Sequence, residues 1–162
     1  ACDMYKHKLK LIEKGAKRLG INIIETCLRD GASADKELPS ADRILCDVPC
    51  SGLGVLSRKP EIRYKDDLID TDLADIQYKI LCESAKYLKK GGKLVYSTCT
   101  LNPQENNKNT AKFLAEHNDF EGVELELPPE LKRAFDEKPY EITLMPHTFD
   151  GDGFYIAVLT RR

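Results

Sequence analysis

Helical and strand-like segments alternate along this chain, and no other feature of the sequence constrains its fold as strongly. Apolar residues recur at helical spacing in three segments, residues 4–19, 73–90 and 103–117. Strand-like apolar runs occupy residues 21–27, 42–48 and 93–97. The connections between these strands are long enough to cross over a sheet, so the strands are expected to be parallel. The alternation predicts an α/β protein built on a doubly wound, mostly parallel sheet.

The C-terminal third of the chain predicts a different pairing. A further strand is expected at residues 123–127. Two more strand candidates, residues 140–145 and 154–160, are separated by a turn-rich segment that contains Gly151-Asp152-Gly153. Because a turn-rich segment joins them, these last two strands are expected to form an antiparallel pair.

Composition and charge exclude several classes of protein. The chain has 162 residues, which fits one domain, and its 41% hydrophobic and 32% charged residues place it outside the disordered class. A net charge of -2 excludes a wholly basic nucleic-acid-binding protein but not a local basic patch. The apolar runs are too short for a membrane span or a secretion signal. Six cysteines without a Cys-x-x-Cys pair indicate reduced thiols in a cytoplasmic protein that holds no metal.

Two cysteines follow predicted strands in similar local sequences. Cys50 lies in DVPCSG at residues 47–52, and Cys99 lies in YSTCTL at residues 96–101. Ligands of doubly wound sheets bind at the carboxyl ends of the strands, so both thiols are expected along one edge of the sheet. A thiolate is a nucleophile, and a strand-to-loop junction provides the environment that generates one. The pair therefore indicates a site at which two thiols face one pocket.

A second interpretation of the cysteines is purely structural, because a buried cysteine behaves as a small apolar residue. We accept it for the three cysteines that fall inside regular elements, Cys27, Cys46 and Cys82. For Cys50 and Cys99, each taken alone, the structural and the functional interpretations are equally open.

The loop after Cys50 gathers cations around an aromatic residue. Its positive side chains are Arg58, Lys59, Arg63 and Lys65, and Tyr64 lies among them. Cations neutralise phosphates and an aromatic ring stacks on a base, so the loop predicts contact with RNA or another single strand. For any one of these residues, the alternative is an ordinary solvated side chain of a charged loop.

Acidic residues follow predicted strands at the same edge of the sheet. Asp3 and Asp30 are able to accept hydrogen bonds from a ribose or from a purine amine. Each residue is equally suited to an ordinary helix cap or turn. Composition and spacing leave both interpretations open.

Longer strings around the two cysteines resemble a known enzyme family. DVPCSGLGVL and PEIRY, within residues 47–64, and YSTCTLNPQEN, residues 96–106, are similar to the fourth and sixth motifs of the Sun-type RNA cytosine-5 methyltransferases. Asp3, Asp30 and a closing GDGFY segment match further motifs, so the resemblance covers nearly the whole chain. It is closest to bacterial members that modify small-subunit ribosomal RNA. Methyltransferases of this fold that act on amines carry an aromatic residue where Cys50 stands, which makes the match specific.

The resemblance implies a Rossmann-like fold and methyl transfer from S-adenosylmethionine to C5 of a cytosine in ribosomal RNA. By this resemblance, Cys99 adds to C6 of the base, and Cys50 helps to remove the C5 proton and release the product. DNA cytosine-5 methyltransferases attack with the thiol of the Pro-Cys pair instead, so an exchange of the two roles is the main alternative. The target cytosine must leave its stack, or lie in a single strand, to reach the thiol.

The same resemblance assigns three carboxylates to the cofactor. Asp3 is expected to bind its ribose hydroxyls and Asp30 to lie at its adenine side. Asp47 is expected near the methionine end and the target base.

One feature of the family is missing from the sequence. The first motif, a strand followed by a Gly-rich turn that holds the methionine part of the cofactor, is expected before Asp3, where this chain begins. Residues 1–162 are therefore expected to form a single partial catalytic domain that binds the cofactor weakly and is inactive alone. Two other functions stay open. One is a non-catalytic RNA-binding module with this fold, and the other is a thiol-dependent hydrolase whose base would be His7, His117 or His147.

Overall fold

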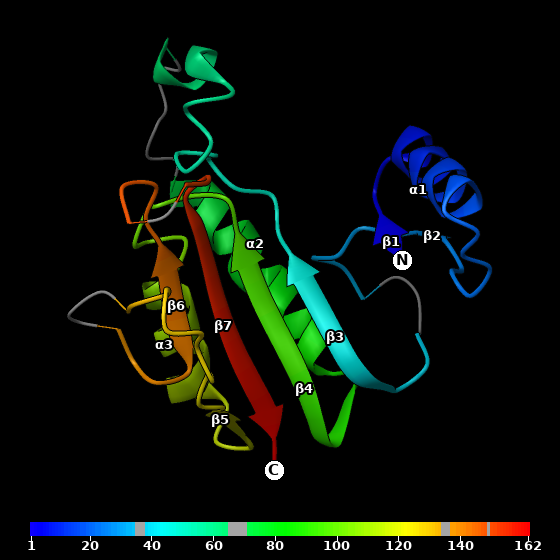
Figure 1. The fold of residues 1–162 in the computed structure, drawn as a ribbon. Helices are drawn as coiled ribbons and strands as arrows, with labels where there is room; N and C mark the ends of the chain where they lie inside the picture. Colours follow the sequence, from blue (N-terminus) through cyan, green and yellow to red (C-terminus); the bar gives the residue numbers. More distant parts are fainter. Residues whose placement is uncertain (35–37, 65–70, 134–136, 149) are drawn as a thin grey trace.

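A computed structural model describes residues 1–34, 38–64, 71–133, 137–148 and 150–162 (Figure 1). The strands in these ranges are β1 (Cys2–Asp3), β2 (Cys27–Leu28), β3 (Ala41–Asp47), β4 (Leu88–Thr98), β5 (Phe120–Gly122), β6 (Glu141–Leu144) and β7 (Phe154–Arg161). The helices are α1 (Lys6–Arg18), α2 (Thr71–Ala85), α3 (Asn107–Glu116) and the 3-10 helix η1 (Pro60–Tyr64). None of the helices in the described ranges is long and apolar enough to cross a membrane.

The larger sheet has the strand order β3-β4-β7-β5, and β6 also pairs with β7. β3 and β4 are parallel, whereas β7 runs antiparallel to β4, β5 and β6. The antiparallel pair expected at the C-terminal end is therefore confirmed as β6 and β7. β1 and β2 form a separate parallel pair beside α1 (Figure 1). The last strand thus enters the sheet against the direction of β3 and β4.

The hydrophobic core lies between the larger sheet and two helices. Alternate residues of β4 and β7 point to the face that α2 and α3 cover, behind the sheet in Figure 1. Side chains without solvent exposure in this core include Leu81, Leu94, Tyr96, Phe113, Ala157 and Leu159. The carboxyl ends of β3 and β4 are therefore fixed by a packed scaffold, and the loops that follow them begin from rigid positions.

β4 begins earlier than the sequence predicts. The helical pattern extends to Lys90 and its end is expected at Gly91, but α2 ends at Ala85 and β4 begins at Leu88. The backbone of Gly91 has a φ of 73°, a conformation that favours glycine. The pairing between β3 and β4 also shifts register between Ala41 and Arg43, at the start of β3. Gly91 therefore belongs to an irregular stretch of strand and not to a helix end.

Two strands are shorter or displaced relative to their predicted positions. Residues 21–26 are irregular because the only described partner of β2 is the two-residue strand β1. The strand predicted at residues 123–127 is found instead as β5, residues 120–122. β6 pairs with residues 154–157 of β7, so it occupies the edge that a longer β5 would need.

Candidate active site at the ends of β3 and β4

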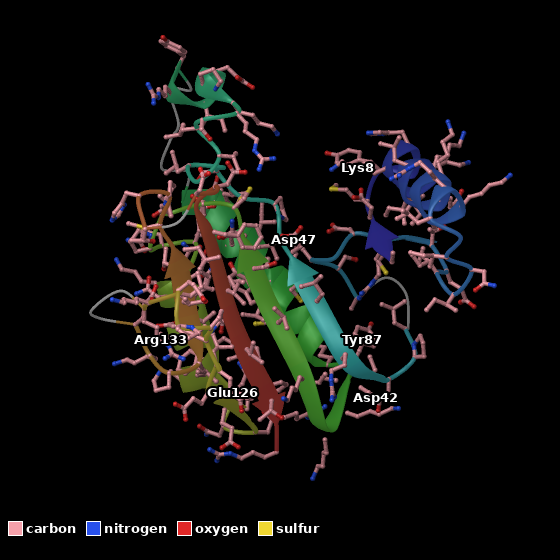
Figure 2. The ribbon with its side chains drawn as sticks, in the orientation of Figure 1. Lys8, Asp42, Asp47, Tyr87, Glu126 and Arg133 are labelled. Carbon is pink, nitrogen blue, oxygen red and sulfur yellow. The ribbon has the colours of Figure 1, made fainter. Side chains whose placement is uncertain are left out.

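β3 and β4 bring the two cysteine loops to one edge of the sheet. Asp47, the last residue of β3, pairs in register with Ser97 near the end of β4 (Figure 2). The Ser97 hydroxyl donates to an Asp47 carboxylate oxygen at 3.1 Å, and the N–H of Val48 donates to the Ser97 carbonyl at 3.2 Å. The chain therefore leaves both strands side by side, as parallel pairing predicts.

The sulfur atoms of Cys50 and Cys99 lie 3.1 Å apart. Both side chains are half-buried, whereas Cys46 lies in the hydrophobic core and Cys82 packs against it. For Cys46 and Cys82, this environment agrees with the structural interpretation. For Cys50 and Cys99, the short distance between the sulfur atoms supports the interpretation as a chemical pair.

Burial and, secondly, the neighbouring Cys99 thiol raise the pKa of the Cys50 thiol to about 12. Cys50 therefore keeps its proton at neutral pH. Two thiolates at this separation would repel each other, so at most one of the two sulfur atoms carries a negative charge.

Alkylation of Cys50 by iodoacetamide is expected to accelerate about tenfold per pH unit between pH 7 and pH 10. Only the thiolate reacts, and its fraction keeps rising with pH because the raised pKa of Cys50 lies above this interval. The rate is measured by mass spectrometry of the Cys50 peptide after short exposures at each pH. In a Cys99→Ser variant the curve is expected to level off at lower pH, since one cause of the raised pKa is removed. A plateau near pH 9 in the unmodified chain would contradict the prediction.

A buried carboxylate, that of Glu105, lies between the two cysteine loops. It accepts hydrogen bonds from the N–H of Ser51 at 2.9 Å and from the Ser51 hydroxyl at 2.6 Å. It also accepts them from Gln77 Nε2 of α2 at 2.7 Å and from Asn102 Nδ2 at 3.0 Å. The sequence analysis missed this residue. Its place in the NPQEN string was the one available signal, because an isolated loop glutamate gives no sign of burial.

The turn that contains Gly153 closes the site from a third direction. The N–H of Gly153 donates to the Gly54 carbonyl at 2.7 Å, and the N–H of Gly54 donates to the Cys99 carbonyl at 3.0 Å. A Cβ atom on Gly54 would lie only 2.0 Å from the Gly153 carbonyl oxygen. The two backbones therefore approach as closely as only glycine allows. This contact brings the GDGFY segment to the cysteine pair.

The cationic loop extends past the edge of the sheet, where η1 projects from the rest of the molecule in Figure 1. Tyr64 is 86% exposed, and Lys59 and Arg63 are exposed as well. Arg58 is exposed too, and its guanidinium also pairs with the Asp152 carboxylate at 2.6 Å. The fourth predicted cation, at position 65, lies outside the described residues.

Two of the three acidic residues assigned to the cofactor, Asp3 and Asp30, lie at the other pair of strands, whereas Asp47 ends β3. Asp3 is the last residue of β1, and its carboxylate accepts a hydrogen bond from the N–H of Tyr5 at 2.8 Å. The same carboxylate lies 3.9 Å from Nζ of Lys8, which Figure 2 labels. Asp30 follows β2 and accepts a hydrogen bond from the N–H of Ala32 at 2.9 Å. Both carboxylates therefore also serve in local turns, which was the alternative interpretation.

The histidines give the hydrolase interpretation no support. His117 stacks on Phe113 with a 4.1 Å separation of ring centroids, and His7 packs beside Tyr5 on α1. His147 is exposed in the turn after β6. A hydrolytic thiol requires a base within hydrogen-bond reach, and these contacts hold two of the candidate bases elsewhere.

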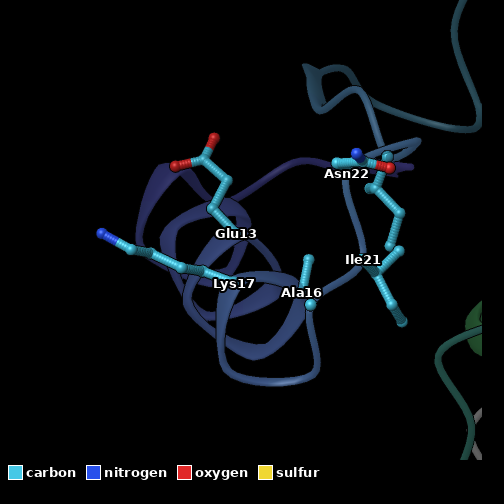
Figure 3. Close-up of a pocket in the computed structure, with 7 residues that line it drawn as sticks. Glu13, Ala16, Lys17, Ile21 and Asn22 are labelled. Atoms are coloured by element: carbon cyan, nitrogen blue, oxygen red, sulfur yellow. The ribbon is translucent and has the colours of Figure 1, made fainter.

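A pocket lies between the second half of α1 and the segment that follows it (Figure 3). Its lining consists of Glu13, Ala16, Lys17, Gly20, Ile21, Asn22 and Ile24. Neither member of the cysteine pair belongs to this lining, so the candidate site is a different place from this pocket.

Comparison with known sequences places the chain in a family. The family model described as 16S rRNA methyltransferase RsmB/F matches residues 1–160. The chain is 42% identical to the probable ribosomal RNA small subunit methyltransferase B of Bacillus subtilis, over 99% of this chain and 37% of the relative. It is 34% identical to the ribosomal RNA small subunit methyltransferase B of Yersinia enterocolitica, over 100% of this chain and 36% of the relative. The chain thus spans little more than a third of these relatives.

Comparison with solved structures agrees. NSun6 from Pyrococcus horikoshii, determined with SFG, matches with a TM-score of 0.85 and 30% identity, over 99% of this chain and 40% of that chain. A methyltransferase homologue from the same organism matches with a TM-score of 0.78 and 25% identity, over 100% of this chain and 52% of that chain. The Rossmann-like methyltransferase fold predicted from the sequence is therefore confirmed. By sequence and by fold, the chain belongs to the RsmB/F family of 16S rRNA methyltransferases.

Proposed function

We propose that this chain supplies the cysteine-bearing part of an enzyme that methylates C5 of a cytosine in small-subunit ribosomal RNA. The observation that carries the proposal is the 3.1 Å separation of the Cys50 and Cys99 sulfur atoms at the ends of two parallel strands. A ring carbon of cytosine is a poor nucleophile until another group adds to the ring. The cysteine pair meets that requirement. One sulfur atom adds to the ring, and the second, beside it, removes the proton from C5.

In this proposal Cys99 attacks C6 of the target cytosine, and C5 becomes electron-rich. S-adenosylmethionine, when bound, supplies the methyl group that C5 accepts. Cys50 then loses its own proton to solvent and, as a thiolate, removes the proton from C5, and elimination of Cys99 as a thiolate restores the aromatic ring. Once its sulfur is bonded to C6, Cys99 no longer disfavours ionisation of Cys50, so part of the cause of the raised Cys50 pKa is removed at the step that needs a base.

Asp3 and Asp30 fit the cofactor side of the proposal. Both are carboxylates at the carboxyl ends of parallel strands, where doubly wound sheets bind nucleotides. Asp3 is only partly exposed, and Asp30 is exposed, so each offers an acceptor oxygen to a ribose hydroxyl or a purine amine. Asp47 lies at the end of β3, close to the cysteine loops, and we assign it to the methionine end and the base.

The test is methyl transfer by a full-length methyltransferase that carries this chain, incubated with S-adenosylmethionine and a small-subunit ribosomal RNA fragment. Nucleoside mass spectrometry is expected to detect 5-methylcytidine. Methylation of another base, or of another atom of cytosine, would overturn the proposal. RNA binding without any methylation would favour the second candidate.

That second candidate is a non-catalytic RNA-binding module, and the exposure of Tyr64 beside Arg63 favours it. In either case Arg63→Gln is expected to weaken RNA binding several-fold at low salt and to reduce its salt dependence, because one phosphate contact is lost. Fluorescence anisotropy with labelled RNA at several salt concentrations measures both effects. Lys108→Gln, at an exposed position on α3, is the matched control and should change little. Equal losses in the two variants would indicate nonspecific attraction instead of a contact by the cationic loop.

A further inference from the structure

The carboxylate of Glu105 is buried, with 1% of the residue exposed, although loop glutamates are normally solvated. One oxygen, Oε2, accepts hydrogen bonds from the N–H of Ser51 and from Gln77 Nε2. The other, Oε1, accepts them from the Ser51 hydroxyl and from Asn102 Nδ2. An ionised carboxylate is an acceptor only, so these donors match the charged form and offset the cost of its burial.

These donors flank the cysteines. Ser51 follows Cys50 directly, and Gln77 Nε2 also donates to the carbonyl of Pro49, which precedes Cys50, at 2.7 Å. The Ser51 hydroxyl lies 2.7 Å from Thr100 Oγ1, and Thr100 follows Cys99. The Glu105 carboxylate therefore holds Ser51 directly and Pro49 by way of Gln77. By way of Ser51 it also holds Thr100, the residue after Cys99.

Glu105 itself is held by its backbone. Its carbonyl accepts a hydrogen bond from the hydroxyl of the fully buried Tyr96 at 2.6 Å, and its N–H donates to the Asn102 carbonyl at 3.1 Å. Tyr96 belongs to β4, so this hydrogen bond fixes Glu105 to the buried core of the sheet. An anchored anion between two loops sets their spacing.

We propose that Glu105 is a positioning residue for the cysteine pair, and that its ionised carboxylate holds the two loops so that the Cys50 and Cys99 sulfur atoms meet. The inference deepens the proposed function, because the geometry it maintains is the one that cytosine methylation requires. Glu105 acts through Ser51 and Gln77, and we assign it no contact with substrate. We call the contacts of the Glu105 carboxylate with Ser51, Gln77 and Asn102 the Glu105 clamp. Replacement of one carboxylate oxygen by an amide NH2 turns its hydrogen atoms toward the hydrogen atoms of these donors, so the contacts on that side of the clamp are lost.

The test measures how readily the two sulfur atoms meet, which does not depend on methyl transfer. Diamide oxidises two neighbouring thiols to a disulfide and takes up their two protons and two electrons. In the unmodified chain, Cys50 and Cys99 are expected to crosslink rapidly, as followed by mass spectrometry of the linked peptides. Glu105→Gln is expected to slow this crosslinking at least about tenfold. In a full-length methyltransferase that carries the chain, the same variant is expected to lower kcat about 100-fold with little change in KM for RNA.

Glu141→Gln is the matched control, because Glu141 is also buried, with 3% exposure, and accepts hydrogen bonds from Tyr155 and Thr110 away from the cysteines. It is expected to lower stability without slowing the crosslink. If Glu105→Gln does not fold, Ser51→Ala removes one clamp contact and is expected to slow the crosslink in the same direction.

Rapid crosslinking in folded Glu105→Gln, or in Ser51→Ala where that variant replaces it, would overturn the positioning role. An equal slowing in Glu141→Gln would do the same, since the effect would then be a general loss of stability. If the unmodified chain crosslinks rapidly but the full-length enzyme leaves cytosine unmethylated, the proposed function fails while the role of Glu105 in holding the thiols stands.

Discussion

Cys99→Ser, in a full-length methyltransferase that carries this chain, is expected to abolish methylation of cytosine, with a loss of at least about 10³-fold. A serine hydroxyl is a far weaker nucleophile than a thiolate, and in the proposed reaction nothing else adds to C6 of the base. The measurement is a covalent protein–RNA adduct on a denaturing gel, formed with RNA that contains 5-fluorocytosine. Fluorine at C5 cannot leave as a proton, so the enzyme is trapped on its substrate. The Cys99→Ser variant is expected to form no adduct.

Cys50→Ser provides the comparison, because it changes the other sulfur atom of the same pair. This variant is expected to form the adduct with 5-fluorocytosine RNA and also to accumulate it with unmodified RNA, since removal of the C5 proton is impaired. Both variants are expected to lose turnover, so the adduct and not the rate separates their roles. An adduct with Cys99→Ser and none with Cys50→Ser would exchange the two assignments.

Gly54→Ala is expected to lower the free energy of unfolding by about 3 kcal/mol, toward the upper end of the range for overpacking. The added Cβ would lie 2.0 Å from the Gly153 carbonyl oxygen and 2.8 Å from the Cys99 carbonyl oxygen. Both obstructing atoms belong to the backbone, so no side-chain rotation relieves the clash. The loop must move away from Cys99, and diamide crosslinking of the two thiols is expected to slow with it. Urea unfolding of the chain measures the change in stability.

Gly15→Ala is the control for the same chemical change. Gly15 lies in α1, and a Cβ built there has no atom within 4 Å. Alanine favours a helix over glycine by roughly 0.5–1 kcal/mol, so this variant is expected to be slightly more stable. Gly54→Ala with unchanged stability would show that the two backbones have room to separate.

The meeting of the two thiols is the part of the site that follows most directly from sequence. Strands that alternate with helices run parallel, and the carboxyl ends of neighbouring parallel strands share one edge of a sheet. Cys50 and Cys99 each follow such a strand, so their proximity needs no knowledge of side-chain packing. The matched strings around them then limit the chemistry to one family.

Contacts that depend on distant residues could not be predicted in this way. The clamp at Glu105 needs Gln77, which reaches it from the middle of α2, and no local pattern links the two positions. The ion pair of Arg58 with Asp152 could not be predicted either, and the neighbouring contact from Ser57 to Asp152 joins residues 95 apart in sequence. Similarly, the start of β4 at Leu88 depends on pairing with β3, which overrides the helical pattern extending to Lys90.

The position of β7 in the sheet has a consequence for how the protein is made. β7 is the last strand in the described residues, yet it lies between β4 and β5 and also pairs with β6. During synthesis the earlier strands emerge first, and β4 keeps an open edge until residues 154–161 have been made. The Gly153 turn docks onto Gly54 from the start of this same late segment. A nascent chain is therefore expected to bring Gly153 against Gly54, beside the cysteine pair, only after β7 has been synthesised, and premature termination before β7 should leave an aggregation-prone polypeptide that lacks this contact.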